Sequence, residues 1–455
     1  MEKLEKNYKK IAIVIIIIGI LLRMVYISYT SIEERQHDMD GKIGHLGYIY
    51  TIYKTGELPT ENKGQFYHPP LHHSISAGFL KLQTKMNIDL AQATENIQIL
   101  TAIYSCITLI IIYLILNRVN IKKIYKIIIM TIMAVYPSFI ILAGSINNDM
   151  LAIMFEFLII LYLLKWHEKT NIKNTILLGV FTAAALLTKV STMIMGLPIA
   201  IVFIDKIILE IHRCKRHSFK KEDIIKIVRK YIIIFLLFGL ISIGIGFAYI
   251  IRNLILFGQS PLYVVKVVDL YYCGDASFVD RFTLFSPEWI KDTYCNSKEE
   301  CNIFAWIVRC SVLGEYADTS GKYIVLAQIL KWTNAILIFI GLFSLIRVII
   351  RQFIKKIRQK NNSNILREIL LITYITMVVT YIYGVLSMPY GCTMDFRYIV
   401  PTAFLGITFI FMDLADSENK KYYNVYRIIV YLLLAILIIA SVISVFTLTK
   451  YLQLV

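Results

Sequence analysis

Eleven apolar runs constrain this chain more than any other feature, because each is long enough, or nearly long enough, to cross a bilayer as a helix. Such a crossing needs about 20 residues. With 57% hydrophobic and only 17% charged residues, the composition is also far from that of a soluble globular domain. The sequence therefore predicts an all-α polytopic membrane protein with about 11 transmembrane helices, in a single membrane-embedded domain over 1–455. The runs are 11–30, 97–117, 127–143, 150–166, 175–188, 190–209, 231–251, 324–346, 368–386, 398–414 and 427–448.

Lysine and arginine are concentrated in alternate connections between these runs. Short loops that are moved across a membrane avoid positive charge, so the basic connections are expected on the cytoplasmic side. The formal net charge of +17 is then mainly a signal of topology, and it predicts contact with anionic membrane lipid and no nucleic acid. The basic segments are the N-terminus, 118–126, 165–173, 212–230, 347–367 and 420–427.

Two of the opposite loops are large, at 31–96 and 252–323, and the chemistry is expected there. In the first loop apolar residues recur every three or four positions, which predicts helices along the membrane interface. In the second, Ser286 and Pro287 begin a predicted helix as N-cap and first-turn residue. Both loops are predicted to be extracytoplasmic parts of a plasma-membrane protein. The apolar series of the first loop is Ile75, Phe79, Leu82, Met86 and Leu90.

Two carboxylates, Asp38 and Asp40, lie in the first outer loop, directly after the first apolar run. Charged residues such as Glu33, Glu34 and Arg35 surround them, so solvated surface charge is one interpretation. A carboxylate with an ordinary pKa of about 3.9 is ionised near neutral pH and can accept a proton from a hydroxyl group. The other interpretation is that one of the two aspartates is a catalytic base.

A histidine-proline segment, His68-Pro69-Pro70-Leu71-His72-His73, follows in the same loop. The two prolines predict a rigid elbow before a helix. An elbow alone and an elbow with substrate contact are both open interpretations. The histidine spacing matches no zinc signature, so no metal is assigned to this segment.

The tight loop Ser145-Ile146-Asn147-Asn148-Asp149 joins two apolar runs on the outer side. A simple turn is one interpretation. Asn148 and Asp149 are nevertheless held at the membrane surface, where they can meet the first loop and orient a donor. A divalent cation bound by this loop is the alternative, and no other cofactor is predicted.

Three cations, Lys189, Arg252 and Arg397, are predicted at the outward ends of their helices. Long cationic side chains often reach toward the interface without any further function. Three cations on one surface would also suit the phosphate of an anionic lipid. Glu156 lies inside the fourth run and must face protein or water, which favours a structural carboxyl over a proton relay.

Five of the seven cysteines are predicted on the outer side, where disulfides persist. Cys295 and Cys301 lie six residues apart in one loop and are the easiest pair to close. Buried free thiols are the alternative. The five are Cys273, Cys295, Cys301, Cys310 and Cys392.

Several short segments together resemble a known family. HD-x-DGKIGHLGYIYTIYKTGELP followed by QFYHPPLHH is similar to the first outer loop of membrane-embedded GT-C fold glycosyltransferases, in the branch of the protein O-mannosyltransferases and aminoarabinose transferases. The segments SINND, LLTKVSTMIMGLPI, IRNLILFGQSPL and FRYIVP resemble later parts of that superfamily, in the same order. Each motif is short, and the ordered set is the more specific signal.

The resemblance implies transfer of one hexose or pentose from a polyprenyl-phosphate donor to an acceptor protein, lipid or cell-envelope glycan on the outer face. It also implies that an aspartate of the first outer loop is the base. This role falls on Asp38 or Asp40, with Asp38 narrowly preferred. The family often has Asp-Glu where this chain has Asp38-Met39-Asp40, which leaves the choice open. The substrate-binding candidates are His45, Tyr67, His68, His72, Asn148, Asp149, Lys189, Arg252 and Arg397.

The residue types fit this chemistry independently. An acceptor hydroxyl that loses its proton to the aspartate would attack the anomeric carbon on the side opposite the phosphate and invert its configuration. The leaving lipid phosphate needs positive charge more than a general acid, and the three outer cations can supply it.

Two rival classes are weighed against a single-sugar transferase. A secondary transporter would show broken helices with charges near the midplane, whereas the charges here lie at helix ends. A glycopolymer polymerase or ligase usually has its main outer loop late in the chain, with arginine and histidine as working residues. The early carboxylates favour single-sugar transfer over both.

Overall fold

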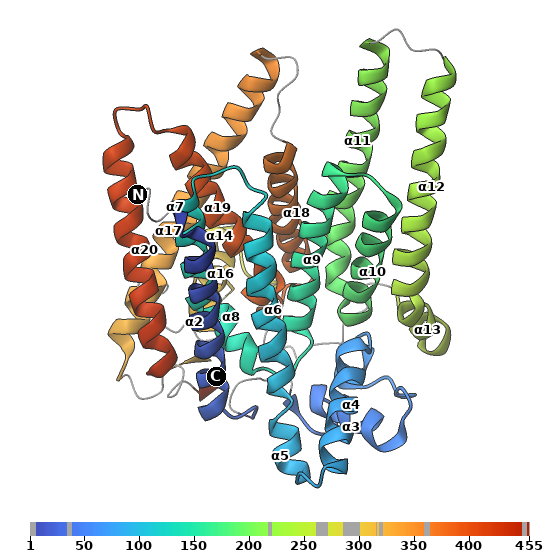
Figure 1. Ribbon diagram of the computed structural model, residues 1–455. Helices are drawn as coiled ribbons and strands as arrows, with labels where there is room; N and C mark the ends of the chain where they lie inside the picture. The colour runs from blue at the N-terminus through green and yellow to red at the C-terminus, as the bar shows by residue number, and fades with distance from the viewer. Residues whose placement is uncertain are drawn as a thin grey trace.

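The computed structural model describes residues 6–33, 39–216, 221–260, 272–284, 301–314, 316–317, 322–358, 365–447 and 453–454. Nearly all of them are helical (Figure 1), and two short strands, β1 (Tyr316–Ala317) and β2 (Gln453–Leu454), pair antiparallel. The first half of the chain contains α2 (Tyr8–Tyr29), α3 (His45–Thr55), η2 (Gly64–Tyr67), α4 (Leu71–Lys85), α5 (Leu90–Glu95), α6 (Gln98–Leu116), α7 (Lys123–Val135), α8 (Pro137–Ile141), η3 (Leu142–Gly144), α9 (Asp149–Glu168), α10 (Ile172–Thr188), η4 (Val190–Met195) and α11 (Gly196–Arg216). The second half contains α12 (Lys221–Gly246), α13 (Ala248–Phe257), α14 (Phe278–Phe282), α16 (Ile303–Leu313), α17 (Ile324–Arg358), α18 (Ile365–Ser387), η6 (Gly391–Met394), η7 (Phe396–Tyr398), α19 (Pro401–Asp416) and α20 (Tyr423–Phe446).

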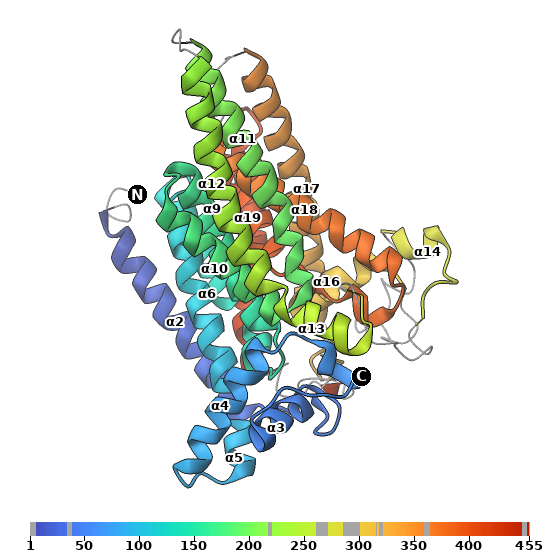
Figure 2. The same ribbon diagram turned by 90° about the vertical axis from the view of Figure 1, so that its right-hand side faces the viewer.

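The helices form a bundle with two distinct ends. The facing ends of α11 and α12, of α17 and α18 and of α19 and α20 lie toward the upper end in Figure 1, and they carry the described parts of the basic segments 212–230, 347–367 and 420–427. Helices α3, α4 and α5 lie at the lower end in both views (Figures 1 and 2). The first outer loop and these basic connections are therefore at opposite ends of the molecule, as the charge pattern predicts.

The eleven predicted runs fall largely on helices, but the count of eleven membrane spans is not confirmed. Within the described ranges, seven helices are long and apolar enough to cross a membrane, or up to nine if two bent pairs each form one span. One pair is α7 with α8 and η3, bent by 46°, and the other is α12 with α13, bent by 45°. Pro137 explains the first bend, because proline cannot continue a preceding helix. The runs 175–188 and 398–414 form α10 and α19, of 17 and 16 residues, which are shorter than a full span.

Helix α9 is the centre of the bundle. In the most apolar 18-residue stretch of α9, 78% of the residues are buried. In the corresponding stretch of the peripheral helix α2, 28% are buried. Helix α9 packs against α6, α10, α11, α18 and α19. Glu156 on this helix is buried and faces protein, in agreement with the prediction. The first residue of α9 is thus held rigidly at the end of the bundle where the first outer loop lies.

The first outer loop is built around a tight turn at Asp40. The Asp40 carboxylate accepts hydrogen bonds from the backbone N–H groups of Lys42 and Ile43, both at 2.7 Å. Two glycines allow the close approach: a Cβ on Gly47 would lie 2.6 Å from the Lys42 carbonyl oxygen, and a Cβ on Gly64, where φ is 46°, would lie 2.1 Å from that of Ile43. Asp40 is therefore an exposed group that stabilises the turn before α3.

The segment 74–98 is mostly helical, as its apolar spacing predicts. It forms α4, α5 and the start of α6. Ile75, Leu82, Met86 and Leu90 are all exposed. An exposed apolar edge suits a helix at a membrane interface, and that location remains a prediction.

Helix α13 holds the first outer loop through its backbone. Three side chains of α13 each donate a hydrogen bond to a main-chain carbonyl oxygen of that loop. Because these contacts join segments nearly two hundred residues apart, α13 fixes the loop against the bundle. The pairs are Arg252 with Pro59 (2.7 Å), Tyr249 with Phe66 (2.9 Å) and Asn253 with Tyr67 (3.5 Å).

The disulfide of the second outer loop differs from the easiest predicted pair. Cys273 is bonded to Cys301, 28 residues away. The backbone N–H of Cys273 also donates to the Pro389 carbonyl oxygen at 2.6 Å, which holds Cys273 beside the segment after α18. The pairing of Cys295 with Cys301 is therefore wrong, because tertiary contact rather than spacing selects the partner. Cys295 and the predicted helix start at Ser286 lie outside the described residues.

We expect removal of this disulfide to destabilise the protein. The loss of a cross-link that closes 28 residues corresponds to about 3 kcal/mol of unfolding free energy, since the unfolded chain gains conformational freedom. The measurement is the melting temperature of detergent-solubilised Cys273→Ser, Cys301→Ser and the double variant. A reductant should lower the melting temperature of the wild type but not that of the double variant. Equal sensitivity of both to reductant would contradict the prediction.

Candidate active site

Four histidines gather where the first outer loop meets the helix ends, and all four are buried. Nδ1 of His45 on α3 and Nε2 of His73 on α4 are 2.9 Å apart, so one donates to the other. The His45 ring is stacked with those of His68 and His73, with centroids 5.2 Å apart in each case. Nε2 of His72 lies 2.8 Å from the carbonyl oxygen of Ile146, to which it donates a hydrogen bond. The proline elbow thus directs the rings of His72 and His73 into the protein, and His72 reaches the segment before α9.

A buried ion pair lies beside the histidines. Asp149, the first residue of α9, pairs with Lys189, the residue that follows α10. Nε of Arg397 lies 3.7 Å from Oδ2 of the same aspartate. The ring of Tyr398 faces both cations, with its centroid 4.5 Å from Nζ of Lys189 and 5.5 Å from Cζ of Arg397. Lys189 is only 8% exposed, so it does not extend into solvent. Two cations thus meet around the carboxylate of Asp149 at this place.

Asn148 precedes Asp149 as the N-cap of α9. Its Nδ2 donates to the Thr188 carbonyl oxygen at 2.7 Å. Its Oδ1 is buried and has no hydrogen-bond partner among the residues that the structure describes. A buried acceptor without a donor costs free energy, so this oxygen is an unsatisfied acceptor beside the ion pair.

Burial favours the neutral form of His68, His72 and His73. Desolvation lowers the pKa of His72 to about 4, against smaller opposing effects of the Ile146 carbonyl and Asp149. Desolvation also holds the pKa values of His68 and His73 well below their ordinary value. For His68 the charges of Lys189 and Arg397 lower the pKa further, so the histidines and the ion pair form one electrostatic unit.

We expect this unit to make the protein acid-sensitive. The folded pKa values lie below the unfolded value of about 6.5, so the unfolded chain binds more protons as the pH falls. The stabilisation is complete above about pH 6.5 and is lost progressively toward about pH 4, where His72 titrates. The melting temperature, measured as a function of pH, tests this loss of stability. His73→Phe keeps an aromatic ring against Tyr48 and should flatten the profile; an unchanged profile would contradict the assignment.

The structure separates some sequence-predicted residues from this cluster. Asp40 is exposed, and the backbone N–H groups of Ile43 and Lys42 lower its pKa. Arg252 binds the Pro59 carbonyl instead of joining the other cations. The ring of Tyr67 contacts that of His68, with centroids 4.2 Å apart, at the edge of the cluster. Asp38 lies outside the described residues.

Two further residues belong to the cluster but were not selected from the sequence. Tyr398 follows Arg397 in the segment FRYIVP. An aromatic residue next to a cation was the feature of the sequence that could have identified it. Tyr48 lies three residues after His45, on the same face of α3. Its ring is stacked on His73 at 4.2 Å, and its hydroxyl donates to Tyr249 at 2.9 Å.

The cluster does not resemble a metal centre. Among the described residues, no group of three or more histidine, cysteine, aspartate or glutamate side chains is arranged to hold a metal ion. Asp149 is already paired with Lys189 and faces Arg397, so a divalent cation would meet two positive charges there. The donor set therefore does not fit the divalent cation considered for the Ser145–Asp149 loop, and it suits an anion.

Comparison with known proteins finds one family model and several solved structures that are similar to this chain. Residues 67–248 match the family model of the dolichyl-phosphate-mannose-protein mannosyltransferases. No curated protein matches the sequence as a whole. The solved oligosaccharyltransferase AglB of Archaeoglobus fulgidus, in complex with an inhibitory peptide and a dolichol-phosphate, is similar with a TM-score of 0.53 and 11% identity, over 98% of this chain and 56% of that one.

Two other solved structures are also similar. The Archaeoglobus fulgidus oligosaccharyltransferase tethered to an acceptor peptide matches with a TM-score of 0.51 and 11% identity, over 99% of this chain and 56% of that one. ArnT from Cupriavidus metallidurans bound to undecaprenyl phosphate gives a TM-score of 0.37 and 11% identity, over 94% and 77% of the two chains. The chain thus spans just over half the length of the archaeal enzyme. The resemblance seen in the sequence is confirmed at the level of the fold: this chain has the GT-C fold of the archaeal oligosaccharyltransferase, and its residues 67–248 match the mannosyltransferase family model.

Proposed function

We propose that this chain is an inverting glycosyltransferase. It moves a sugar from a polyprenyl-phosphate donor to an acceptor hydroxyl on the extracytoplasmic face of the plasma membrane. The observation that supports this best is the buried cluster of Lys189, Arg397 and Asp149 where the first outer loop meets the helix ends. The matched family is named for a dolichyl-phosphate-mannose donor, and the archaeal structure holds a dolichol-phosphate, which supports a lipid-phosphate donor here.

Lys189 and Arg397 are proposed to bind the donor phosphate. Both cations are held in place by Asp149 and by the ring of Tyr398, so they need little rearrangement to receive an anion. When the sugar–oxygen bond breaks, its electron pair goes to the lipid phosphate, and preorganised positive charge stabilises that leaving group. Oδ1 of Asn148, which has no partner among the described residues, is proposed to accept a hydrogen bond from a hydroxyl of the donor sugar.

Asp38 is proposed as the base that takes the acceptor proton. Asp40 already stabilises the turn before α3, and its lowered pKa makes it a weaker base. Asp38 lies two residues earlier in the same outer loop. As the proton moves to Asp38, the acceptor oxygen attacks the anomeric carbon on the side opposite the phosphate.

The first outer loop, 31–96, is proposed as the catalytic loop of a single membrane-embedded domain. The rings of Tyr67 and His45 both contact that of His68, and these residues are proposed, together with His72, to contact the substrate. Arg252 is proposed to position this loop rather than bind phosphate, because it donates to the Pro59 carbonyl. The second large loop, 252–323, is proposed to take part in selecting the acceptor, which is a protein, a lipid or a cell-envelope glycan.

Lipid-phosphate binding tests the proposal directly. Purified protein in detergent is titrated with undecaprenyl phosphate, and Arg397→Gln is expected to raise the dissociation constant about 10- to 100-fold, because a hydrogen bond to a charged group is lost. Arg252→Gln is the matched control and should bind nearly as the wild type does. Unchanged binding in Arg397→Gln would contradict the phosphate site. Mass spectrometry of cell-surface glycans with and without the protein would then identify the sugar.

A further inference from the structure

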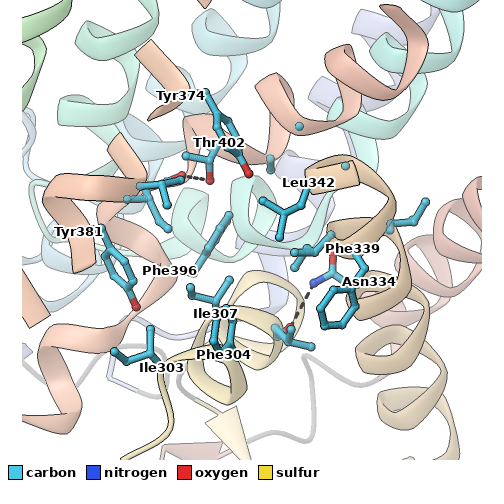
Figure 3. Close-up of a pocket in the computed structure, with 18 of the residues that line it drawn as sticks. Ile303, Phe304, Ile307, Asn334, Phe339, Leu342, Tyr374, Tyr381, Phe396 and Thr402 are labelled. Atoms are coloured by element: carbon cyan, nitrogen blue, oxygen red, sulfur yellow. Dashed lines mark hydrogen bonds between the residues drawn. The ribbon is translucent and has the colours of Figure 1, made fainter. Parts of the chain in front are cut away.

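A cavity of about 130 Å³ lies between α16, α17, α18 and α19, apart from the charged cluster (Figure 3). The side chains of Phe304, Ile307, Leu342 and Phe396 converge on it. Its wall is largely apolar. The cavity therefore suits a hydrocarbon ligand. The proposed sugar transfer does not use the residues that line it.

The polar side chains in its wall are mostly satisfied by the protein itself. Asn334 donates to Ser311 at 2.7 Å and to the Val308 carbonyl oxygen at 3.2 Å. The hydroxyl of Thr402 donates to the Ile399 carbonyl oxygen at 2.6 Å. A ligand with its own donors and acceptors would find few free partners here, so an unsubstituted hydrocarbon chain fits better than a sugar or a peptide.

The cavity adjoins the proposed phosphate site through one short turn. Arg397 and Tyr398 lie in η7, and the residues on either side of them, Phe396 and Ile399, both line the cavity and are buried. The same few residues thus have positive charge on one side and the cavity wall on the other. A molecule with an anionic head at Arg397 and a hydrocarbon tail matches both.

Two glycines form part of the cavity wall. Gly341 on α17 and Gly406 on α19 approach closely, since a Cβ on Gly341 would lie 3.7 Å from the Gly406 carbonyl oxygen. A Cβ on Gly406 would meet only the ring of Tyr374, which lines the cavity, at 3.9 Å. A small added side chain is therefore tolerated at either position, whereas a large one at Gly406 would occupy the cavity.

We propose that this cavity receives the part of the carrier-lipid chain nearest the phosphate, and that Gly406 determines how much of that chain it admits. This rests on the proposed lipid-phosphate donor. The carrier is favoured over a membrane phospholipid because the cation site lies at one side of the cavity, where a single-chain phosphate has its head. Gly406 is then a determinant of carrier specificity, while Arg397 and Lys189 recognise the head group.

The test is a titration of purified full-length protein with undecaprenyl phosphate and with farnesyl phosphate, whose chain is much shorter. Gly406→Leu is expected to weaken undecaprenyl phosphate binding about tenfold or more, since exclusion of even two methylene-sized groups corresponds to that factor. Farnesyl phosphate should lose less, because fewer of its carbons reach Gly406. Gly384→Leu is the matched control, because a Cβ there meets nothing within 4 Å.

Each other outcome also decides the proposal. Unchanged undecaprenyl phosphate binding in Gly406→Leu overturns it, as does an equal loss for both lipids. If mass spectrometry finds a co-purified phospholipid that only Gly406→Leu loses, with undecaprenyl phosphate binding unchanged, the cavity belongs to that phospholipid. If Gly406→Leu does not fold, the single methyl groups of Gly406→Ala and Gly341→Ala should each weaken undecaprenyl phosphate binding by a smaller factor. If neither variant weakens binding, the proposal is overturned.

The variant Arg397→Gln in the same titration keeps this proposal separate from the proposed function. A loss in Arg397→Gln without a loss in Gly406→Leu overturns the cavity assignment alone. A loss in Gly406→Leu without one in Arg397→Gln overturns the phosphate site and leaves the cavity as a chain-binding site.

Discussion

Replacing Asp38 by asparagine is expected to lower the rate of sugar transfer about 10²- to 10⁴-fold, because the substitution keeps the shape of the side chain but removes the proton acceptor. Asp40→Asn should have a much smaller effect. An asparagine oxygen can still accept the two backbone hydrogen bonds that Asp40 receives, so the turn before α3 persists. The measurement is transfer activity in membranes that contain equal amounts of each protein.

The pair of variants separates a catalytic role from a structural one. Because Asp38→Asn changes only the chemical step, undecaprenyl phosphate should bind to it as it does to the wild type. A large loss in Asp40→Asn together with an active Asp38→Asn would reverse the assignment. Full activity in both would exclude an aspartate of this loop as the base.

Removing the carboxylate of Asp149 is expected to cost about 3–5 kcal/mol of unfolding free energy, since two buried cations would be left without their counter-charge. The melting temperature of Asp149→Ala in detergent measures the loss. The double variant Asp149→Ala with Lys189→Met should recover part of it, because one of the unpaired cations is then replaced by an apolar side chain of similar length.

Charge coupling distinguishes this effect from a packing defect. If the double variant is less stable than Asp149→Ala by the full cost of Lys189→Met alone, the two residues are independent and the ion pair contributes nothing. Asp149→Asn gives a second comparison, because it keeps the volume of the side chain but removes its charge. We expect Asp149→Asn to be nearly as unstable as Asp149→Ala.

The parts of the fold that depend on local composition were predictable. The apolar runs and the basic connections follow from the cost of placing charge in hydrocarbon, and the described parts of 212–230, 347–367 and 420–427 lie at one end of the bundle. The number of spans was not predictable in this way. The bends at Pro137 and after Gly246, and the shortness of α10 and α19, depend on how the helices pack against one another.

The candidate site was predictable as a set of residues but not as an arrangement. Motif order identified Asn148, Asp149, Lys189 and Arg397, which the structure brings together. At the turn formed by Asp40, Gly47 lies close to Lys42 and Gly64 lies close to Ile43. Residue spacing alone does not reveal these contacts. The pairing of Cys273 with Cys301 likewise depends on tertiary contact.

The way in which α13 holds the first outer loop has a consequence for how the sequence of this protein can vary. The three hydrogen bonds from α13 end on main-chain carbonyl oxygens, which every amino acid provides. The side chains of 59–67 can therefore be exchanged without loss of these anchors, except at Gly64, where a Cβ would lie 2.1 Å from the Ile43 carbonyl oxygen. Segments of related proteins that keep this glycine can be grafted into the stretch while α13 still holds it.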